Sequence, residues 1–382
     1  MIPLAEPLLK GNELKYVQEC IETGWVSSVG KFVDRFEDSV ATFVGSKYAV
    51  AMSNGTAALH TALLVSGIKP GDEVIVPTLT FIAPINVVTY CGAYPVFMDC
   101  DKALNIDVDK VGQFLEQECV LKIDGTYRKK TGRRVHAIIP VHVFGNPVSI
   151  RPLARLAQEY RLKLIEDATE SLGSYFSEKH TGTFGTAGCF SFNGNKIITT
   201  GGGGMLVTDD EKIAQQARHL STQAKEDNLY YSHDQVGYNY RLTNIQAALG
   251  LAQMETLPAI LEMKHVQYEY YLENLREIPG LRMITPPLGT RPNHWFHTII
   301  IDPVVYKCTR DEILKKLISF EIQARPVWKL NHKQKPYQSA ESFFIEKAPL
   351  LQAQAINLPC SSSLTEDQMK TVIDVLKKGS RL

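Results

Sequence analysis

The sequence has no excess of charge of either sign. Its 382 residues contain 41 basic (Lys and Arg) and 41 acidic (Asp and Glu) side chains, so the formal net charge is zero. Proteins that bind nucleic acid or anionic membranes generally carry a basic excess, because they neutralise phosphates. The balanced composition therefore argues against both kinds of partner and is typical of an ordinary globular protein.

Paired cysteines and long apolar runs are also missing. The cysteines stand singly, without a CxxC pair or the spacing of a metal site; they are Cys20, Cys91, Cys100, Cys119, Cys189, Cys308 and Cys360. We expect buried free thiols in a reducing compartment, and no metal. No apolar run reaches transmembrane length, and the first residues lack the basic and apolar regions of a signal peptide. These features lead us to expect a cytoplasmic protein.

The length exceeds the size at which a single hydrophobic core usually stops growing, so we expect two domains. A helical pattern over residues 243–257 stops before Pro258, which is typical of a helix boundary, and a second pattern covers 259–277. We therefore expect a large domain over residues 1–257 and a small α/β domain over residues 258–382.

An insertion with the pattern of a hairpin interrupts the large domain at about residues 120–135. Its basic side chains are Arg128, Lys129, Lys130, Arg133 and Arg134. Such a cluster is usually a solvated surface. A basic lip that attracts a diphosphate through long-range charge is the alternative.

Apolar strand patterns alternate with helical patterns through the first half of the chain. The strand patterns cover residues 48–52, 71–77, 93–99, 137–143 and 162–167. Such an alternation indicates a mainly parallel sheet with helices on both faces. Ligands of these sheets bind at the carboxyl ends of the strands. We therefore expect Ser53, His142 and Asp167, which follow strands, to lie along one rim.

Lys196 lies between an apolar run that starts at Gly188 and the four glycines Gly201 to Gly204. Burial removes water from an ammonium group and favours the neutral amine, which is a nucleophile for carbonyl carbons. The alternative is a surface lysine on a glycine-rich loop. This stretch alone leaves both interpretations open.

The strand over residues 48–52 is followed by Ser53-Asn54-Gly55-Thr56, which opens an alanine-rich helix. The free N–H groups and the positive dipole end of a helix N-terminus form an anion site. Simple capping of the helix by Ser53 or Asn54 is the alternative.

Taken in order, these features match what pyridoxal phosphate requires of a protein. Gly55 and Thr56 can supply N–H donors for the phosphate, and Phe81 can stack on the pyridine ring. Asp167, at the end of a strand, can keep the ring nitrogen protonated. Lys196 can bond to the cofactor and then move a proton between substrate and cofactor.

From Ile2 almost to the C-terminus, the sequence closely resembles the DegT/DnrJ/StrS family of sugar-nucleotide aminotransferases, which have the aspartate-aminotransferase fold (fold type I). The motifs are Ser53 to Leu59, Pro77 to Phe81, Glu166 to Gly173, Phe190 to Lys196 with Gly201 to Gly204, and Gly237 to Arg241. The resemblance implies a seven-stranded, mainly parallel sheet, a smaller C-terminal domain, and pyridoxal phosphate with pyridoxamine phosphate as its second form.

The resemblance also implies roles for single residues. Ser191 would bind the cofactor phosphate together with Asn54, Gly55 and Thr56. Asn239 would reach that phosphate from a neighbouring subunit, so each active site would need a homodimer.

Three further residues are expected near the sugar nucleotide. His142 and His332 would lie close to it, although a lone histidine is more often a hydrogen-bonded core residue. Arg325 could bind a diphosphate or a carboxylate through its fork, and a structural salt bridge is the alternative.

Two positions depart from the family pattern. Glu170 stands where many members have a glutamine that meets the cofactor's phenolic oxygen. Two negative groups there would repel each other, so either Glu170 carries a proton or its contact differs. The run Gly201 to Gly204 has no glutamate, which the family often has.

Asp167 to Ser171 (Asp-Ala-Thr-Glu-Ser) and the hairpin look most like enzymes of bacillosamine or legionaminic acid synthesis. We therefore expect glutamate to donate the amino group to a UDP-linked 4-keto-6-deoxy-N-acetylhexosamine. The alternatives are an aminotransferase of the GDP-perosamine type or one acting on a dTDP-sugar. A sugar dehydratase on the same scaffold would carry histidine in place of Lys196, and a non-catalytic regulator would not need that lysine.

Overall fold

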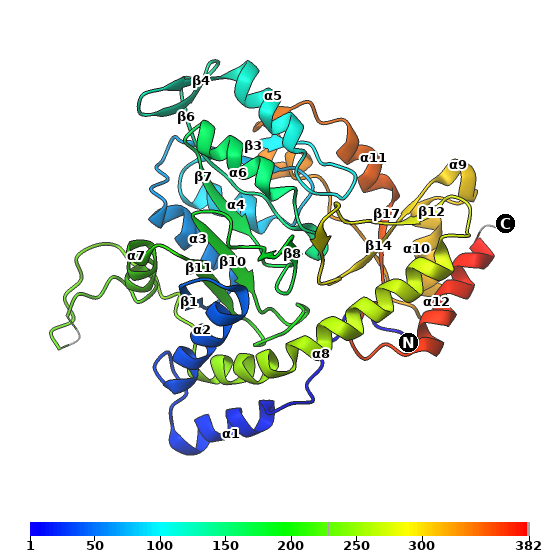
Figure 1. The fold of residues 1–382 in the computed structure, drawn as a ribbon, viewed down its shortest axis with the longest axis horizontal. Helices are drawn as coiled ribbons and strands as arrows, with labels where there is room; N and C mark the ends of the chain where they lie inside the picture. Colours follow the sequence, from blue (N-terminus) through cyan, green and yellow to red (C-terminus); the bar gives the residue numbers. More distant parts are fainter. Residues whose placement is uncertain (228, 380–382) are drawn as a thin grey trace.

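The computed structural model describes residues 1–227 and 229–379 and contains one large sheet and two smaller ones (Figure 1). The large sheet has the strand order β1-β11-β10-β7-β6-β2-β3-β16, and the hairpin β4-β5 joins it through β6. Its strands are β1 (Tyr48–Met52), β2 (Glu73–Pro77), β3 (Tyr94–Met98), β4 (Cys119–Lys122), β5 (Gly125–Arg128), β6 (Arg134–Ile138), β7 (Lys163–Asp167), β10 (Ala187–Ser191), β11 (Gly204–Thr208) and β16 (Glu341–Phe343).

The order and direction of the strands confirm a mainly parallel α/β sheet. All neighbours from β10 through β7, β6, β2 and β3 to β16 are parallel, whereas β11 is antiparallel to both β1 and β10. The path from β1 to β3 has the seven strands expected from the family resemblance, and β16 and the hairpin extend it.

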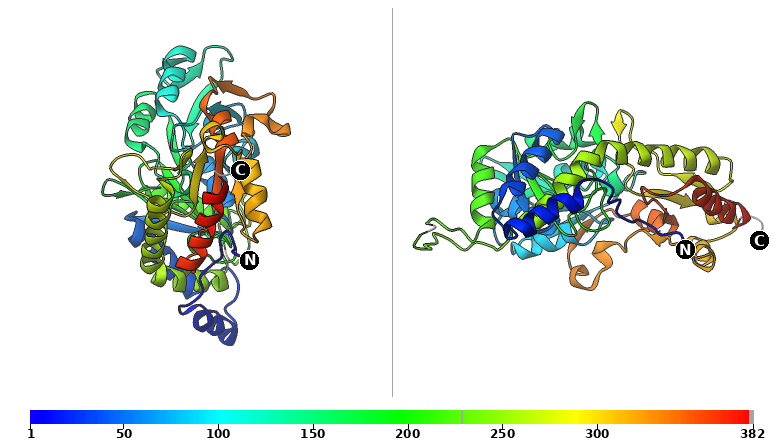
Figure 2. Two further views of the ribbon diagram at one scale, coloured as in Figure 1. Left: turned by 90° about the vertical axis from the view of Figure 1, so that its right-hand side faces the viewer. Right: turned by 90° about the horizontal axis from the view of Figure 1, so that it is seen from below.

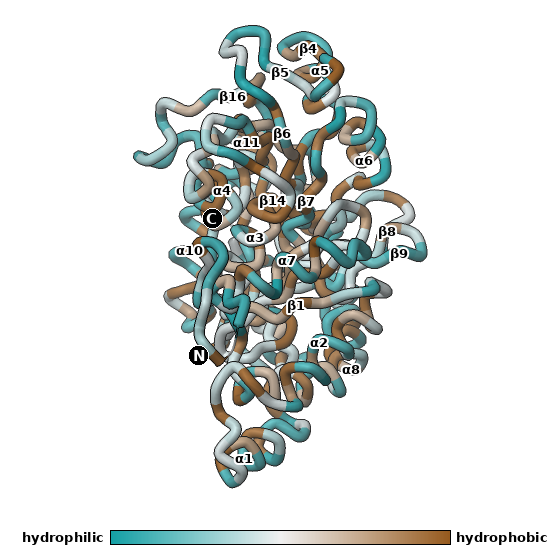
Figure 3. Tube along the Cα trace, turned by 90° about the vertical axis from the view of Figure 1, so that its left-hand side faces the viewer, coloured by the Kyte–Doolittle hydropathy of each residue, from teal (hydrophilic) through white to brown (hydrophobic). Residues whose placement is uncertain are grey.

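Helices cover both faces of this sheet. In β1, Ala49 and Ala51 pack into one core with α2 and α8, whereas Val50 and Met52 pack into another with α3, α4 and α7. Successive side chains of a strand point to opposite faces, so each core receives alternate residues. Figure 3 shows hydrophobic segments along the central strands. The helices are α1 (Glu13–Thr23), α2 (Lys31–Val44), α3 (Gly55–Val65), α4 (Ala83–Tyr90), α5 (Val108–Glu118), α6 (Ile150–Glu159) and α7 (Glu211–Ser221).

The helix break expected at Pro258 is wrong. A single helix, α8 (Asn244–Leu275), runs through Pro258 for 32 residues. A proline inside a helix removes one hydrogen bond and costs about 3 kcal/mol or more. The neighbouring side chains of Leu257 and Ile260 are fully buried in the core beneath α2, and we attribute the continuity of α8 to this packing.

A smaller sheet has the order β12-β14-β17-β15, and a three-stranded sheet has the order β13-β8-β9. These strands are β8 (Tyr175–Phe176), β9 (Lys179–His180), β12 (Leu281–Met283), β13 (Thr290–Arg291), β14 (His297–Ile301), β15 (Arg325–Pro326) and β17 (Ala355–Leu358). The remaining helical segments are α9 (Pro303–Tyr306), α10 (Arg310–Ser319), α11 (Lys347–Gln354), α12 (Glu366–Gly379) and the short η1 (Val143–Gly145), η2 (Asn331–Lys333) and η3 (Lys335–Tyr337).

The chain beyond residue 258 belongs partly to the large sheet, because β16 pairs with β3. The N-terminal segment crosses in the other direction, since Ile2 forms a bridge with Ile322 near the small sheet.

The segment between α7 and α8 projects from the body of the molecule (Figures 1 and 2). We call residues 222–227 and 229–240 the arm. Its large apolar side chains include Leu229, Tyr230 and Val236, which are at least three-quarters exposed.

All seven cysteines are buried free thiols, as expected. Among the described helices, none combines the length and apolar character needed to cross a membrane.

Candidate active site

A cavity of about 620 Å³ opens where β1, β7 and β10 end, and residues of the small sheet form its opposite wall. This volume is in the range of small-molecule sites. The structure brings the following predicted residues together around the cavity: Asn54, Gly55, Thr56, Phe81, Asp167, Glu170, Ser191, Lys196 and Arg325.

The N-terminus of α3 forms one end of the cavity. Asn54 caps the helix, because its Oδ1 accepts the N–H of Ala57 at 2.8 Å. The N–H groups of Gly55 and Thr56 lie in the first turn, where a helix offers them no acceptor. A Cβ on Gly55 would lie 2.9 Å from Cβ of Ser191, so glycine is required for this close approach. The capping interpretation is thus correct for Asn54, and the first-turn N–H groups expected to bind an anion lie beside this cap.

Asp167 ends β7 and is 2% exposed. Its Oδ1 accepts the N–H of Thr169 at 3.1 Å. Burial raises the pKa of Asp167, although hydrogen bonds from Thr169 and the charge of Lys196 act in the opposite direction. A buried carboxylate of this kind is stabilised by a cationic partner, which a protonated pyridine nitrogen would supply.

Lys196 lies in the turn that joins β10 to β11. Its Nζ is 3.5 Å from Oε1 of Glu170 and 4.0 Å from the ring centroid of Trp295. The side chain is 12% exposed, so the surface-loop interpretation is wrong. The amine faces the same cavity as Asp167.

Glu170 is held beside the lysine and is 5% exposed. Its Oε2 accepts the N–H of Phe144 at 2.8 Å. Burial raises the pKa of Glu170, and the positive charge of Lys196 together with the Phe144 N–H lowers it in part. The two oxygens of this carboxylate therefore contact the Phe144 N–H and the Lys196 amine.

Aromatic side chains line much of the cavity, and apart from Phe81 the sequence analysis missed them. They are Phe81, Phe144, Trp295, Phe296 and Trp328. Trp328 stacks on Phe144 with ring centroids 4.5 Å apart, and Phe81, which is 55% exposed, tilts toward Trp328 at 6.5 Å. Trp295 and Trp328 lie next to the strands β14 and β15 of the small sheet, but no local sequence pattern places their rings at the cavity.

Polar side chains line the cavity at β15, and we call this exposed part of its wall the mouth. Arg325 is exposed there, and none of the described acidic side chains forms an ion pair with it. Gln323 also lines the mouth and accepts the N–H of Leu4 through Oε1 at 3.1 Å. The structural salt bridge considered for Arg325 is therefore not observed among the described residues.

Three predicted residues do not line this cavity. His142 is fully buried, with Nε2 3.1 Å from Oε2 of Glu166 and Nδ1 accepting the N–H of Val148. His332 has its Nδ1 2.6 Å from Oγ1 of Thr78.

Asn239, the third, is exposed at the base of the arm. Placed there, its side chain lies outside the cavity of its own chain.

The basic hairpin does not present a free cationic lip. Arg128 is 4% exposed and lies within 3.5–3.7 Å of Glu73, Glu118 and Glu341. Lys130 pairs with Glu341 at 2.8 Å. These charges are largely compensated within the chain and tie the hairpin to β2 and β16.

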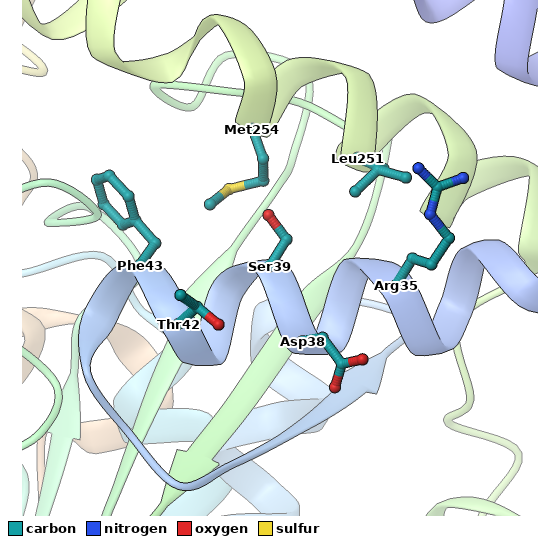
Figure 4. Close-up of a pocket in the computed structure, with 7 residues that line it drawn as sticks. All are labelled: Arg35, Asp38, Ser39, Thr42, Phe43, Leu251 and Met254. Carbon is teal, nitrogen blue, oxygen red and sulfur yellow. The ribbon is translucent and has the colours of Figure 1, made fainter.

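A second cavity, of about 460 Å³, lies between α2 and α8 (Figure 4). Its described lining is Arg35, Asp38, Ser39, Thr42, Phe43, Leu251 and Met254. Lysine, histidine and cysteine are missing from this lining, so we assign it no catalytic role. Among residues 1–227 and 229–379, no group of three or more His, Cys, Asp or Glu side chains is placed to hold a metal ion.

Comparisons with known proteins identify the family of the chain. A model of the DegT/DnrJ/EryC1/StrS aminotransferase family matches residues 7–377. GDP-perosamine synthases from Caulobacter vibrioides and Vibrio cholerae are 39% and 38% identical; the alignments cover 98% and 99% of this chain and 97% and 98% of theirs. The crystal structure of a DegT DnrJ EryC1 StrS aminotransferase from Brucella abortus superposes with a TM-score of 0.88 at 27% identity, over 96% of this chain and 95% of that one.

The fold, the cavity and these comparisons define a pyridoxal phosphate-dependent aminotransferase of fold type I. The chain belongs to the DegT/DnrJ/EryC1/StrS aminotransferase family, as the sequence motifs indicated. The residues present fit the cofactor: the α3 N-terminus suits a phosphate, Asp167 suits a pyridine nitrogen, and Lys196 offers an amine in the same cavity.

Proposed function

We propose that the chain transfers the amino group of glutamate to the keto carbon of a GDP-linked 4-keto-6-deoxy sugar, for the synthesis of a surface polysaccharide. The observation that carries this proposal is the similarity, along 98–99% of the chain, to two GDP-perosamine synthases. These relatives do not support the UDP-linked N-acetylhexosamine expected from the sequence. The GDP-type alternative fits better.

Different side chains of the cavity would bind the cofactor, keep its ring protonated and transfer the proton. When bound, pyridoxal phosphate supplies an electron-accepting ring that carries the amino group between the two substrates. The N–H groups of Gly55 and Thr56, with Ser191, would hold its phosphate. Asp167 would keep a proton on the ring nitrogen, and Lys196 would take the proton from one carbon atom and return it to another.

The aromatic and polar parts of the cavity suit the two ends of a nucleotide sugar. Phe81 would cover one face of the cofactor ring. Arg325, which is exposed at the mouth, would bind the diphosphate through its planar fork. The retained Lys196 argues against a dehydratase and against a regulator that merely holds the cofactor.

We further propose that two copies of the chain share their active sites. The arm exposes Leu229, Tyr230 and Val236, and a free surface rarely presents so many large apolar groups together. Asn239 lies at the base of this arm and outside its own cavity, which suits a contact with the cofactor phosphate of a second copy.

We place the reaction in the cytoplasm. The support is that all seven cysteines are buried free thiols, as a reducing compartment favours. Fractionation of the native host cells with an antibody against the chain tests this assignment, and recovery outside the cytoplasm would reject it.

A substrate panel tests the proposed reaction. The purified protein, loaded with pyridoxal phosphate, is incubated with glutamate and with GDP-, UDP- and dTDP-linked 4-keto-6-deoxy sugars, and the products are identified by mass. We expect the amino sugar to form fastest from the GDP-linked substrate. A preference of tenfold or more for the UDP-linked or dTDP-linked sugar would reject the GDP assignment and leave the reaction type standing.

A further inference from the structure

Trp295 provides a contact to the catalytic lysine that the sequence motifs do not suggest. Nζ of Lys196 lies 4.0 Å from the centroid of the Trp295 ring, and the same atom is 3.5 Å from Oε1 of Glu170. An ammonium group over the face of an indole ring is attracted by its quadrupole, and tryptophan is the strongest side chain in this respect. The amine is therefore contacted by an aromatic face and by a carboxylate.

The Trp295 ring is fixed to the loop that carries the lysine. Its Nε1–H donates to the backbone oxygen of Asn195, the residue before Lys196, at 2.7 Å. Its backbone N–H donates to Oδ1 of Asn293 at 2.9 Å, and its backbone oxygen accepts from Nζ of the buried Lys264 at 3.2 Å. Trp295 is 4% exposed, so little freedom is left to the ring.

Asn293 connects Trp295 to Glu170, the acidic side chain beside Lys196. While its Oδ1 accepts from Trp295, its Nδ2 donates to the backbone oxygen of Glu170 at 2.9 Å and to that of Leu172 at 2.9 Å. One buried amide thereby sets the position of both groups that contact the lysine amine.

We propose that Trp295 is a positioning residue for Lys196: it holds the lysine amine against its ring face and beside Glu170, so that the amine stays aimed into the cavity. Proton transfer is sensitive to the position of the base, and a locked partner reduces the orientations that the long lysine side chain can adopt. The inference rests on the proposed catalytic role of Lys196.

The first test uses the cofactor-free protein and does not depend on catalysis. Lysines are briefly methylated with formaldehyde and borohydride, and each site is quantified by peptide mass spectrometry. In Trp295→Leu the amine loses both the aromatic contact and its steric cover, so we expect Lys196 to react at least about fivefold faster. Trp295→Phe keeps a ring face and should stay within about twofold of the parent chain.

Two controls separate positioning from packing. Lys264, which donates to the Trp295 backbone, should stay protected in every variant; if it reacts together with Lys196, Trp295 only packs the loop and the inference is wrong. Trp328→Leu removes another ring of the same cavity that does not contact Lys196. An equal rise at Lys196 in that variant, or no rise in Trp295→Leu, would also overturn the inference.

The second readout uses the protein loaded with pyridoxal phosphate. We expect Trp295→Leu to lower kcat about tenfold with KM for the nucleotide sugar changed less than threefold, and Trp295→Phe to recover most of the loss. Faster methylation with unchanged kcat would overturn the positioning role. Full activity of Lys196→Ala would reject the proposed function instead, whatever the methylation pattern shows.

Discussion

At the scale of single residues, Asp167 is the side chain that most clearly needs a cationic partner. It is buried, its pKa is raised by that burial, and no cationic side chain among the described residues lies within ion-pair distance of it. In Asp167→Asn the shape is kept and the charge is lost, so the cofactor ring would be a weaker electron acceptor. We expect kcat to fall at least about a hundredfold while the fold is retained, as measured by steady-state kinetics and circular dichroism. A loss of less than tenfold would contradict the role of Asp167.

Glu170 gives a prediction about stability and pH. Its folded-state pKa lies above its ordinary value because it is buried. Such a group costs stability once it ionises, so the cost is absent below its ordinary pKa and grows as the pH rises through the folded pKa. Each pKa unit between the folded and unfolded chain corresponds to about 1.4 kcal/mol.

Glu170→Gln removes this titration. We therefore expect the cofactor-free variant to gain free energy of unfolding, relative to the parent chain, as the pH is raised from about 4 to 7. Urea denaturation at several pH values measures the difference. A constant difference across this range would show that Glu170 does not titrate as described.

Sequence reasoning expected Asp167, Lys196 and the turn at Gly55 to lie close together, and all three line one cavity. The expectation was possible because each of them follows a strand pattern or opens a helix. Sequence reasoning could not identify Trp295, whose contact with Lys196 joins residues 99 positions apart in the chain and depends on tertiary packing. His142 also follows a strand, but its ring turns into the core toward Glu166, a choice that no local pattern reports.

At the scale of elements, some local patterns gave accurate bounds, whereas the strand expected over residues 137–143 is wrong in its end: β6 covers Arg134–Ile138 and η1 begins at Val143. The strand expected over residues 48–52 is β1, and the strand expected over 162–167 is β7. The failure at Pro258 has a physical reason. Helix propensity is low at a proline, so the local pattern predicts a break there. The side chains that flank Pro258 in α8 are buried in the core, and this tertiary packing is not part of any local propensity.

The turn from β1 into α3 carries a prediction of its own. A Cβ at Gly55 would meet Ser191 at 2.9 Å and Thr169 at 3.0 Å, so Gly55→Ala must push outward the turn that we propose binds the cofactor phosphate. We expect at least a tenfold weaker affinity for pyridoxal phosphate, since such overpacking costs about 1–3 kcal/mol. Titration of the cofactor-free protein with pyridoxal phosphate measures this affinity.

Gly194→Ala is the matched control for Gly55→Ala, because a Cβ at Gly194 would meet nothing within 4 Å. Its affinity for pyridoxal phosphate should equal that of the parent chain. Equal affinity of Gly55→Ala and the parent chain would contradict the account of this turn.

At the scale of the whole molecule, the cavity is built where the two sheets meet. The N-terminal segment pairs beside the small sheet, where Leu4 and Ala5 line the cavity, and β16 returns to the large sheet to pair with β3. The sequence predicted a large and a small α/β unit, but not these crossings. They depend on pairings between residues hundreds of positions apart, for which local patterns carry no signal.

Shared active sites predict complementation between two inactive variants. Lys196→Ala and Asn239→Ala are each expected to lower activity strongly. If Asn239 serves the neighbouring subunit, mixed dimers contain one intact site, and an equal mixture should recover about a quarter of the parent activity. Refolding the two chains together and assaying the mixture checks this. Recovery no greater than the sum of the separate variants would place Asn239 in its own subunit's site or outside any site.

The central claim is that this chain moves nitrogen from glutamate to a nucleotide sugar through Lys196. The most direct measurement supplies isotopically labelled glutamate nitrogen with the GDP-linked 4-keto-6-deoxy sugar and follows the label by mass spectrometry. We expect the label in the amino sugar, with one 2-oxoglutarate formed for each product, and no turnover in Lys196→Ala. An unlabelled product, or labelled product formed at the parent rate by Lys196→Ala, would contradict the account.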